Sequence, residues 1–259
     1  MIGGLSRRGD QEEFDFWARQ RADFIMLSVA YDFFLDQSCV ARIAELHRAF
    51  GLNVLIHPRP DGHTLLSPAN PCAHSLLFEA FGAISQLVTT LSLIPKIIVH
   101  LSTYRIPGTD YPAFSEEEAI THTRSFYEGM QSFGNLSLVL ENVYPPGIGW
   151  EELGYKAAHF RMFSLPANSE FCLDTGHLML SQMTVADILT LPFPLTCLHL
   201  HANDGKSDLH KLLTRRDFPE WSELEGLLGA DRYIVLEVKG TTEGLAHALN
   251  GLRHNRLPP

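Results

Sequence analysis

The chain has 259 residues, of which 45% are hydrophobic, and its formal net charge is −10. This acidic balance argues against a surface that binds nucleic acid through lysine and arginine. No apolar run reaches the 18 residues of a membrane-spanning helix, and the first residues lack the apolar stretch of a signal peptide. The four cysteines are scattered without a CxxC pair, so we expect a reduced, cytoplasmic protein with a single domain over residues 1–259.

Eight short apolar runs are rich in residues that favour strands. They span residues 2–6, 23–29, 53–57, 96–100, 136–141, 170–174, 195–201 and 232–237. Stretches with helical spacing of apolar residues lie between them, at 11–21, 39–50, 76–91, 116–133, 184–191, 221–228 and 243–252. This alternation predicts parallel βα units, which are found both in a closed (β/α)8 TIM barrel and in a doubly wound sheet.

Six of these strands end on residue types that bind metals. They are His57, His100, Glu141, Asp174, His199 with His201, and Glu237. Because side chains alternate along a strand, Glu141 shares the face opposite Leu138 and Leu140. The carboxyl ends of the strands of a closed barrel converge on one mouth, whereas an open sheet would spread them along a line. The pattern therefore favours a TIM barrel with its site at the carboxyl end of the strands.

Three further residues extend this set. His177 lies just past Asp174, and Asp208 and His210 are two residues apart, so that both side chains can share one face of an extended loop. The nine candidates combine imidazoles with carboxylates, a mixture that suits Zn²⁺, Mn²⁺ or Fe²⁺ better than Ca²⁺. For any one of them, a solvated or hydrogen-bonded position is the simpler interpretation. Their joint placement at successive strand ends favours a metal site.

The motifs LVLENV, CLDTGHL, HLHANDG…DLH and IVLEV resemble those of the xylose isomerase-like TIM-barrel superfamily. That superfamily includes sugar isomerases and epimerases as well as endonuclease IV. The resemblance implies that a shared divalent metal is held by Glu141, Asp174, His199 and Glu237. In the endonuclease IV branch, a three-metal cluster would be completed by His57, His100, His177, Asp208 and His210. We therefore expect one to three Zn, Mn or Mg ions per chain.

Two chemistries fit these residues. In a sugar or sugar-phosphate isomerase or epimerase, Glu141 and Glu237 would be catalytic, one taking a proton from the substrate and the other returning it. In an endonuclease IV-like phosphodiesterase, several zinc ions would bind a phosphate and activate water. A small phosphodiester suits the acidic chain better than DNA. A silent barrel that only binds a sugar or a metal is the third alternative.

Three histidines are candidates for contacts with the substrate: His177, His201 and His63. His201 faces inward on the sequence pattern, with simple packing as its alternative role, and a solvated loop is the alternative for His63. We expect the isomerase or epimerase, with a small-molecule sugar or phosphate ester as partner and no membrane. A homodimer is compatible with such a barrel, although no patch in the sequence decides it.

Overall fold

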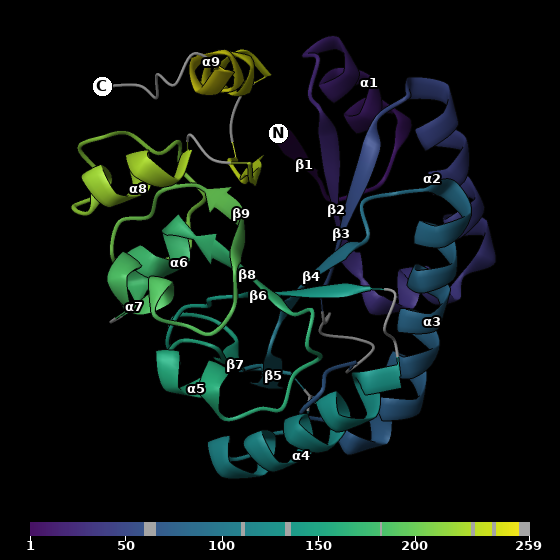
Figure 1. The fold of residues 1–259 in the computed structure, drawn as a ribbon, viewed down its shortest axis with the longest axis vertical. Coiled ribbons are helices and arrows are strands. Elements are labelled where there is room, and N and C mark those ends of the chain that lie inside the picture. Colours follow the sequence, from purple (N-terminus) through teal and green to yellow (C-terminus); the bar gives the residue numbers. More distant parts are fainter. Residues whose placement is uncertain are drawn as a thin grey trace.

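The chain folds into a closed barrel in the computed structural model, which describes residues 1–59, 66–109, 112–132, 136–181, 183–228, 231–239 and 242–253 (Figure 1). Eight strands of these described residues form the barrel: β1 (Ile2–Ser6), β2 (Phe24–Ala30), β3 (Asn53–Arg59), β4 (Lys96–His100), β6 (Ser137–Glu141), β8 (Glu170–Asp174), β9 (Leu195–Leu200) and β10 (Tyr233–Leu236). Their order around the barrel is β1-β10-β9-β8-β6-β4-β3-β2, and neighbouring strands are parallel. The TIM barrel is thus confirmed, and the doubly wound sheet is excluded.

Helices follow the strands and lie outside the barrel. They are α1 (Gln11–Arg19), α2 (Gln37–Phe50), α3 (His74–Leu91), α4 (Glu116–Gly129), α5 (Ala157–Arg161), α6 (Thr175–Leu180), α7 (Val185–Leu189), α8 (Trp221–Leu228) and α9 (Thr242–Arg253). Short 3₁₀ turns occur at η1 (Tyr31–Leu35), η2 (Pro71–Ala73) and η3 (Met130–Ser132). In Figure 1, α2 and α3 run along the right side of the barrel and α4 crosses below it. The sequence pattern predicted α7 within 184–191 but did not predict α5 and α6, which have five and six residues.

Local sequence signals set the ends of the longer helices. Asp36 caps α2 by accepting a hydrogen bond from the Ser38 backbone N–H at 2.8 Å. Ser115 and Glu118 form a capping box at the start of α4. Gly51 ends α2 with a φ of 65°, in the left-handed region that glycine adopts without a steric penalty. These signals fix where α2 and α4 begin and where α2 ends before the chain returns to the barrel.

The two faces of each strand have different surroundings. Val139, Cys172, Cys197 and Val235 belong to a buried apolar cluster inside the barrel. The neighbouring positions Leu138, Leu140, Leu198, Leu200, Ile234 and Leu236 belong to the larger core between strands and helices. The alternation predicted from the sequence is therefore confirmed, and it directs every second residue of a strand toward the barrel axis.

A two-stranded antiparallel ribbon lies outside the barrel sheet. It pairs β5 (Ser102–Arg105) with β7 (Glu151–Leu153), and its strands follow β4 and β6 in the chain. The sequence pattern did not predict these strands, because STYR and EEL contain no apolar run. The ribbon places residues from two connecting segments beside the carboxyl ends of the barrel strands.

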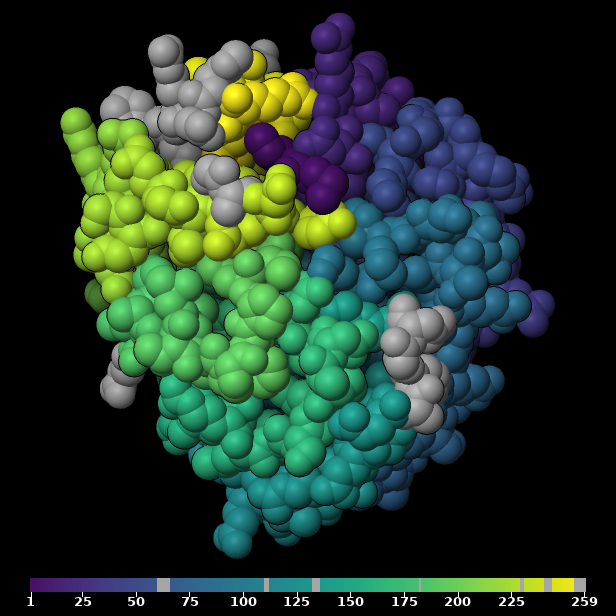
Figure 2. Space-filling model, in the orientation of Figure 1, coloured from purple at the N-terminus to yellow at the C-terminus, as the bar shows by residue number. Residues whose placement is uncertain are grey.

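The first and last strands are neighbours, since β1 pairs with β10 and so closes the barrel. Figure 2 shows the purple N-terminal residues beside the yellow C-terminal elements at this closure. Of the helices in the described part of the chain, none is both long and apolar enough to cross a bilayer.

Candidate metal centre

Four residues meet at the carboxyl end of neighbouring strands. They are Glu141 at the end of β6, Asp174 at the end of β8, His199 in β9 and Glu237 just after β10. Strand pairing sets this arrangement, because Asp174 is in register with His199. One ligand-type atom from each of the four lies within 4.8 Å of the others. The Nδ1 atom of His199 is 3.1 Å from Glu141 Oε1, 3.7 Å from Asp174 Oδ2 and 3.8 Å from Glu237 Oε2.

These four residues form a donor set that fits a divalent cation. Three of them are carboxylates, and Glu141, Asp174 and His199 have no solvent exposure. Glu141 Oε2 and His199 Nε2 are buried without a hydrogen-bond partner among the described residues. A buried polar atom without a partner costs free energy, and so does an unbalanced buried negative charge. A cation bound among these atoms would relieve both costs.

Electrostatics at the centre favour positive charge. Burial alone would lower the pKa of His199, but the Glu141 and Glu237 carboxylates raise it well above its ordinary value. Burial alone would raise the pKa of Glu237, but His199 lowers it. The lowered pKa of Glu237 and the raised pKa of His199 both mean that the centre attracts positive charge, either as protons or as a metal ion.

A second group of donors surrounds the far oxygen of Glu141. His57 Nε2 is 3.4 Å and His100 Nε2 is 3.7 Å from Glu141 Oε2. His57 donates its other ring N–H to the carbonyl oxygen of Ile98 at 3.0 Å, which leaves Nε2 as an acceptor. Burial together with the neighbouring His100 lowers the pKa of His57 well below its ordinary value. A neutral imidazole held in this way has the form that binds metals.

A third group lies on the other side of the centre. Asp208 Oδ2 is 3.0 Å from His210 Nε2 and 3.9 Å from His177 Nε2. His177 donates from Nδ1 to the Asn142 carbonyl oxygen at 2.9 Å, and His210 donates from Nδ1 to the Glu237 carbonyl oxygen at 2.8 Å. Both rings therefore present Nε2 toward the Asp208 carboxylate. Burial would raise the pKa of Asp208, but the neighbouring His177 and His210 rings hold it well below its ordinary value.

His201 connects this third group with the four-residue centre. Its Nε2 donates to Asp174 at 2.9 Å, and its ring stacks on His210 with centroids 4.2 Å apart. The ring also lies against α6, because a Cβ added at Gly176 would be 1.9 Å from His201 Cε1. Its Nδ1 has no hydrogen-bond partner among the described residues. His201 belongs to two groups of ligand-type residues, and its predicted contact with the substrate stays a prediction.

No protein-family model and no curated protein matches the sequence. A solved structure described as a D-tagatose 3-epimerase-like protein is 18% identical and has a TM-score of 0.75, with 98% of this chain and 97% of that chain covered. The chain therefore shares its (β/α)8 barrel fold with this structure.

Two other solved structures have this fold. The D-allulose 3-epimerase from Methylomonas sp. is 15% identical, with a TM-score of 0.69 and coverage of 96% of this chain and 89% of that one. A xylose isomerase domain protein from Planctomyces limnophilus is 12% identical, with a TM-score of 0.64 and coverage of 98% and 95%. The resemblance drawn from the sequence motifs is thereby confirmed at the level of the fold.

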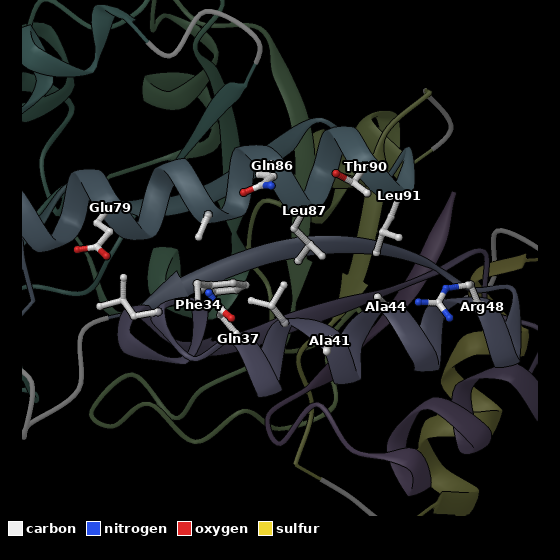
Figure 3. A pocket seen from close by; sticks show the side chains of 13 residues that line it. Phe34, Gln37, Ala41, Ala44, Arg48, Glu79, Gln86, Leu87, Thr90 and Leu91 are labelled. Carbon is white, nitrogen blue, oxygen red and sulfur yellow. The ribbon is translucent and has the colours of Figure 1, made fainter.

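The mouth of the barrel contains a hollow of about 230 Å³. Seven of the predicted site residues line it: His57, His100, Glu141, His177, Asp208, His210 and Glu237. Asp174 and His199 lie beneath it, fully buried. A larger hollow of about 490 Å³ lies between α2 and α3, where Figure 3 shows mainly aliphatic and amide side chains. The smaller hollow is the candidate site, because the ligand-type residues converge there.

The structure thus brings together all nine residues predicted as metal ligands, while their role stays a prediction. His63 lies outside the described residues. Sequence reasoning missed Glu152 on β7, which is 1% exposed and lines the hollow. Its carboxylate accepts hydrogen bonds from Thr103 Oγ1 at 2.7 Å and from His100 Nδ1 at 3.0 Å. Its only sequence signal is the acidic pair after Trp150, which carries no strand pattern.

Proposed function

We propose that the protein is a sugar isomerase or epimerase that depends on a divalent metal ion. The observation that carries this proposal is the buried set of Glu141, Asp174, His199 and Glu237 at the barrel mouth. The solved structures of similar fold support it, since they include a D-tagatose 3-epimerase-like protein and D-allulose 3-epimerase. Zn²⁺, Mn²⁺ and Mg²⁺ all accept the nitrogen and oxygen donors of this set.

The four residues would hold the cation, and the other parts of the site would hold the sugar. When bound, the metal supplies Lewis acidity, which polarises a carbonyl and an adjacent hydroxyl group and so acidifies the neighbouring C–H bond. The hollow offers His57, His100, His177 and Ser28 as hydrogen-bond partners for sugar hydroxyls. Tyr144 and Trp150 add apolar walls, which limit the water that reaches the reacting carbon.

Glu141 and Glu237 would move the proton. They come from β6 and from the residue after β10, and β8 and β9 separate these strands in the barrel. The two carboxyl groups therefore approach the hollow from different sides. One takes the proton from the C–H bond as a carboxylate, and the other starts as a carboxylic acid and gives its proton to the carbon. The substrate atoms and the total number of protons are unchanged, as an epimerisation or isomerisation requires.

A measurement of metal content together with solvent proton exchange tests this function. Protein dialysed with Mn²⁺ or Zn²⁺ should hold about one tightly bound ion per chain. It should also introduce deuterium from D₂O into a ketohexose or its phosphate, as seen by NMR. Glu237→Gln should lower this exchange by at least roughly a hundredfold, because general acid–base groups contribute on this scale. Glu45→Gln, at an exposed position on α2, is the matched control.

Two outcomes would contradict the proposal. One is a protein that binds none of the three metal ions after dialysis against them. The other is a Glu237→Gln variant that exchanges protons as fast as the unaltered protein.

A second function, a multinuclear phosphoesterase, has a specific observation in its favour. Three further donor groups adjoin the four-residue centre: His57 with His100 and Glu141, Asp174 with His177 and His201, and His201 with Asp208 and His210. Two or three ions bound there would give a positively charged site suited to a phosphodiester.

Metal counting separates the two functions. In the phosphoesterase, His57→Ala and His210→Ala should each lower the number of bound ions as well as hydrolysis of a small phosphodiester. In the isomerase, the same variants should keep one ion and weaken sugar binding. Full metal content and full hydrolysis in both variants would exclude the multinuclear site.

A further inference from the structure

Positively charged side chains line the same hollow as the acidic centre. Arg7 follows β1, Arg59 ends β3 and Lys239 lies just after β10. Three cations around one hollow are notable in a chain with a net charge of −10. The ligand-type carboxylates lie buried at the strand ends, whereas Arg7 and Lys239 are exposed at the rim. The hollow therefore has buried acidic residues at its inner end and a basic edge.

Arg7 and Lys239 differ from other cations nearby in their ion pairs. Arg8 pairs with Asp10 at 2.8 Å, and Arg19 pairs with Asp15. Within the described residues, neither Arg7 nor Lys239 forms an ion pair. Their charged groups are thus available to an anion that enters the hollow.

The backbone holds both residues at this edge. Arg7 donates its backbone N–H to Glu13 Oε1 at 3.3 Å, and Lys239 donates its backbone N–H to the His210 carbonyl oxygen at 2.8 Å. Their strands, β1 and β10, are neighbours in the barrel. Both side chains also line an adjoining hollow of about 460 Å³, so they stand on the wall between two open spaces. An anion at this wall would meet two cations from adjacent strands.

The backbone of Lys239 lies near Glu237, one of the two proposed proton-transfer groups. Lys239 lies two residues beyond Glu237, and an extended chain spans at most about 7 Å over two residues. An anionic group at one end of a five- or six-carbon sugar is separated from its reacting carbons by a comparable length. The three carboxylates of the four-residue centre outweigh the charge of one divalent ion, so the basic edge is the better place for this group.

We propose that Arg7 and Lys239 form an anion subsite that binds a terminal phosphate or carboxylate on the sugar. The inference rests on the proposed function, since it assigns that function an anionic sugar as its substrate class. Paired Arg and Lys side chains bind phosphate and carboxylate through charge-assisted hydrogen bonds. A neutral sugar would leave both cations without a partner.

Three probes that differ only at carbon 6 test the subsite: D-fructose, D-fructose 6-phosphate and D-fructuronate. Calorimetry on the metal-loaded protein should show at least roughly tenfold tighter binding of one anionic probe than of D-fructose. A preference for the phosphate identifies a phosphorylated sugar, and a preference for the carboxylate identifies a sugar acid. Arg7→Ala and Lys239→Ala should each remove most of this preference. Arg19→Ala, which lines the adjoining hollow but carries an ion pair, should keep it.

The subsite is overturned if D-fructose binds as well as both anionic probes, or if none of the probes binds. It is also overturned if the Arg19→Ala control loses the preference as much as the two rim variants do, because a diffuse charge effect would then explain it. Proton exchange in D₂O is recorded separately on the same samples. A charge preference without exchange contradicts the proposed reaction alone, and exchange without a charge preference contradicts the subsite alone.

Discussion

The floor and the mouth of the barrel are built from the same strands, but the floor is apolar and packs the interior, whereas the mouth carries the ligand-type residues. In six strands a residue of the inner apolar cluster, which forms the floor, precedes a ligand-type residue by two positions: Leu55 and His57, Ile98 and His100, Val139 and Glu141, Cys172 and Asp174, Cys197 and His199, and Val235 and Glu237. Two residues of a strand span about 7 Å, so a single repeat of the pleat separates the two layers. On the inward-facing side of each strand, one residue therefore packs the barrel interior and the next inward-facing residue belongs to the candidate site.

The largest expected effect is a loss of stability when a residue of the floor is shortened. Leu55 is 1% exposed in the inner cluster and lies two residues before His57. Leu55→Ala should lower the free energy of unfolding by about 3 kcal/mol, because it removes buried methyl groups and leaves a cavity. Denaturant unfolding measures this loss, and metal analysis should show an unchanged number of ions. If Leu55→Ala also released the metal, floor and mouth would not be independent layers.

A slightly smaller effect is expected when the mouth loses its metal. A ligand that binds only the folded chain stabilises it by about 2.7 kcal/mol when its free concentration is 100 times Kd. Chelation should therefore lower the unfolding temperature of the metal-loaded protein, and readdition of the ion should restore it. The Asp174→Asn variant, which alters a buried member of the centre, should show little of this difference. An equal response to chelation in this variant would place the stabilising ion elsewhere.

The smallest expected effect is a loss of activity when Glu152, on the β5–β7 ribbon beside the mouth, is changed. Burial alone would lower the pKa of His100, but the Glu152 carboxylate raises it and accepts its Nδ1–H. Glu152→Gln should lower kcat/KM for proton exchange by roughly tenfold, as is usual when a partner of a site histidine is changed.

The metal content separates two roles of this contact. It should stay unchanged in Glu152→Gln if His100 binds substrate, and a lost ion would show that His100 is a ligand. The neighbouring Glu151→Gln is the control, because Glu151 pairs with Arg105 at 3.2 Å on the outer side of the ribbon.

Strand-borne features of this molecule could be predicted from sequence. The alternation in SLVLE and YIVL indicates which side chains face inward, so it predicts that Glu141 and Glu237 lie at the mouth. Strand ends were less exact. β3 continues two residues beyond His57, and β9 ends at Leu200, one residue before His201. Hydrogen bonding between neighbours sets these ends, and that is not visible in one strand alone.

Features that depend on connecting segments could not be predicted. Glu152 reaches the hollow only because β7 pairs with β5, and neither strand has an apolar pattern. Arg7 and Lys239 reach it because the barrel closes between β1 and β10, which are separated by most of the chain. His210 adopts a φ of 53°, a backbone conformation uncommon for a residue with a side chain, and no sequence rule indicates it.

The lack of a side chain at Gly176 has a consequence for protein engineering. Helix α6 can begin directly against the His201 ring only because nothing projects from this position. Someone who wished to transplant the centre onto another barrel would therefore have to copy the glycine and the first turn of α6 together with the ligands. A graft of the histidines and carboxylates alone would leave the ring without the surface that now holds it in place.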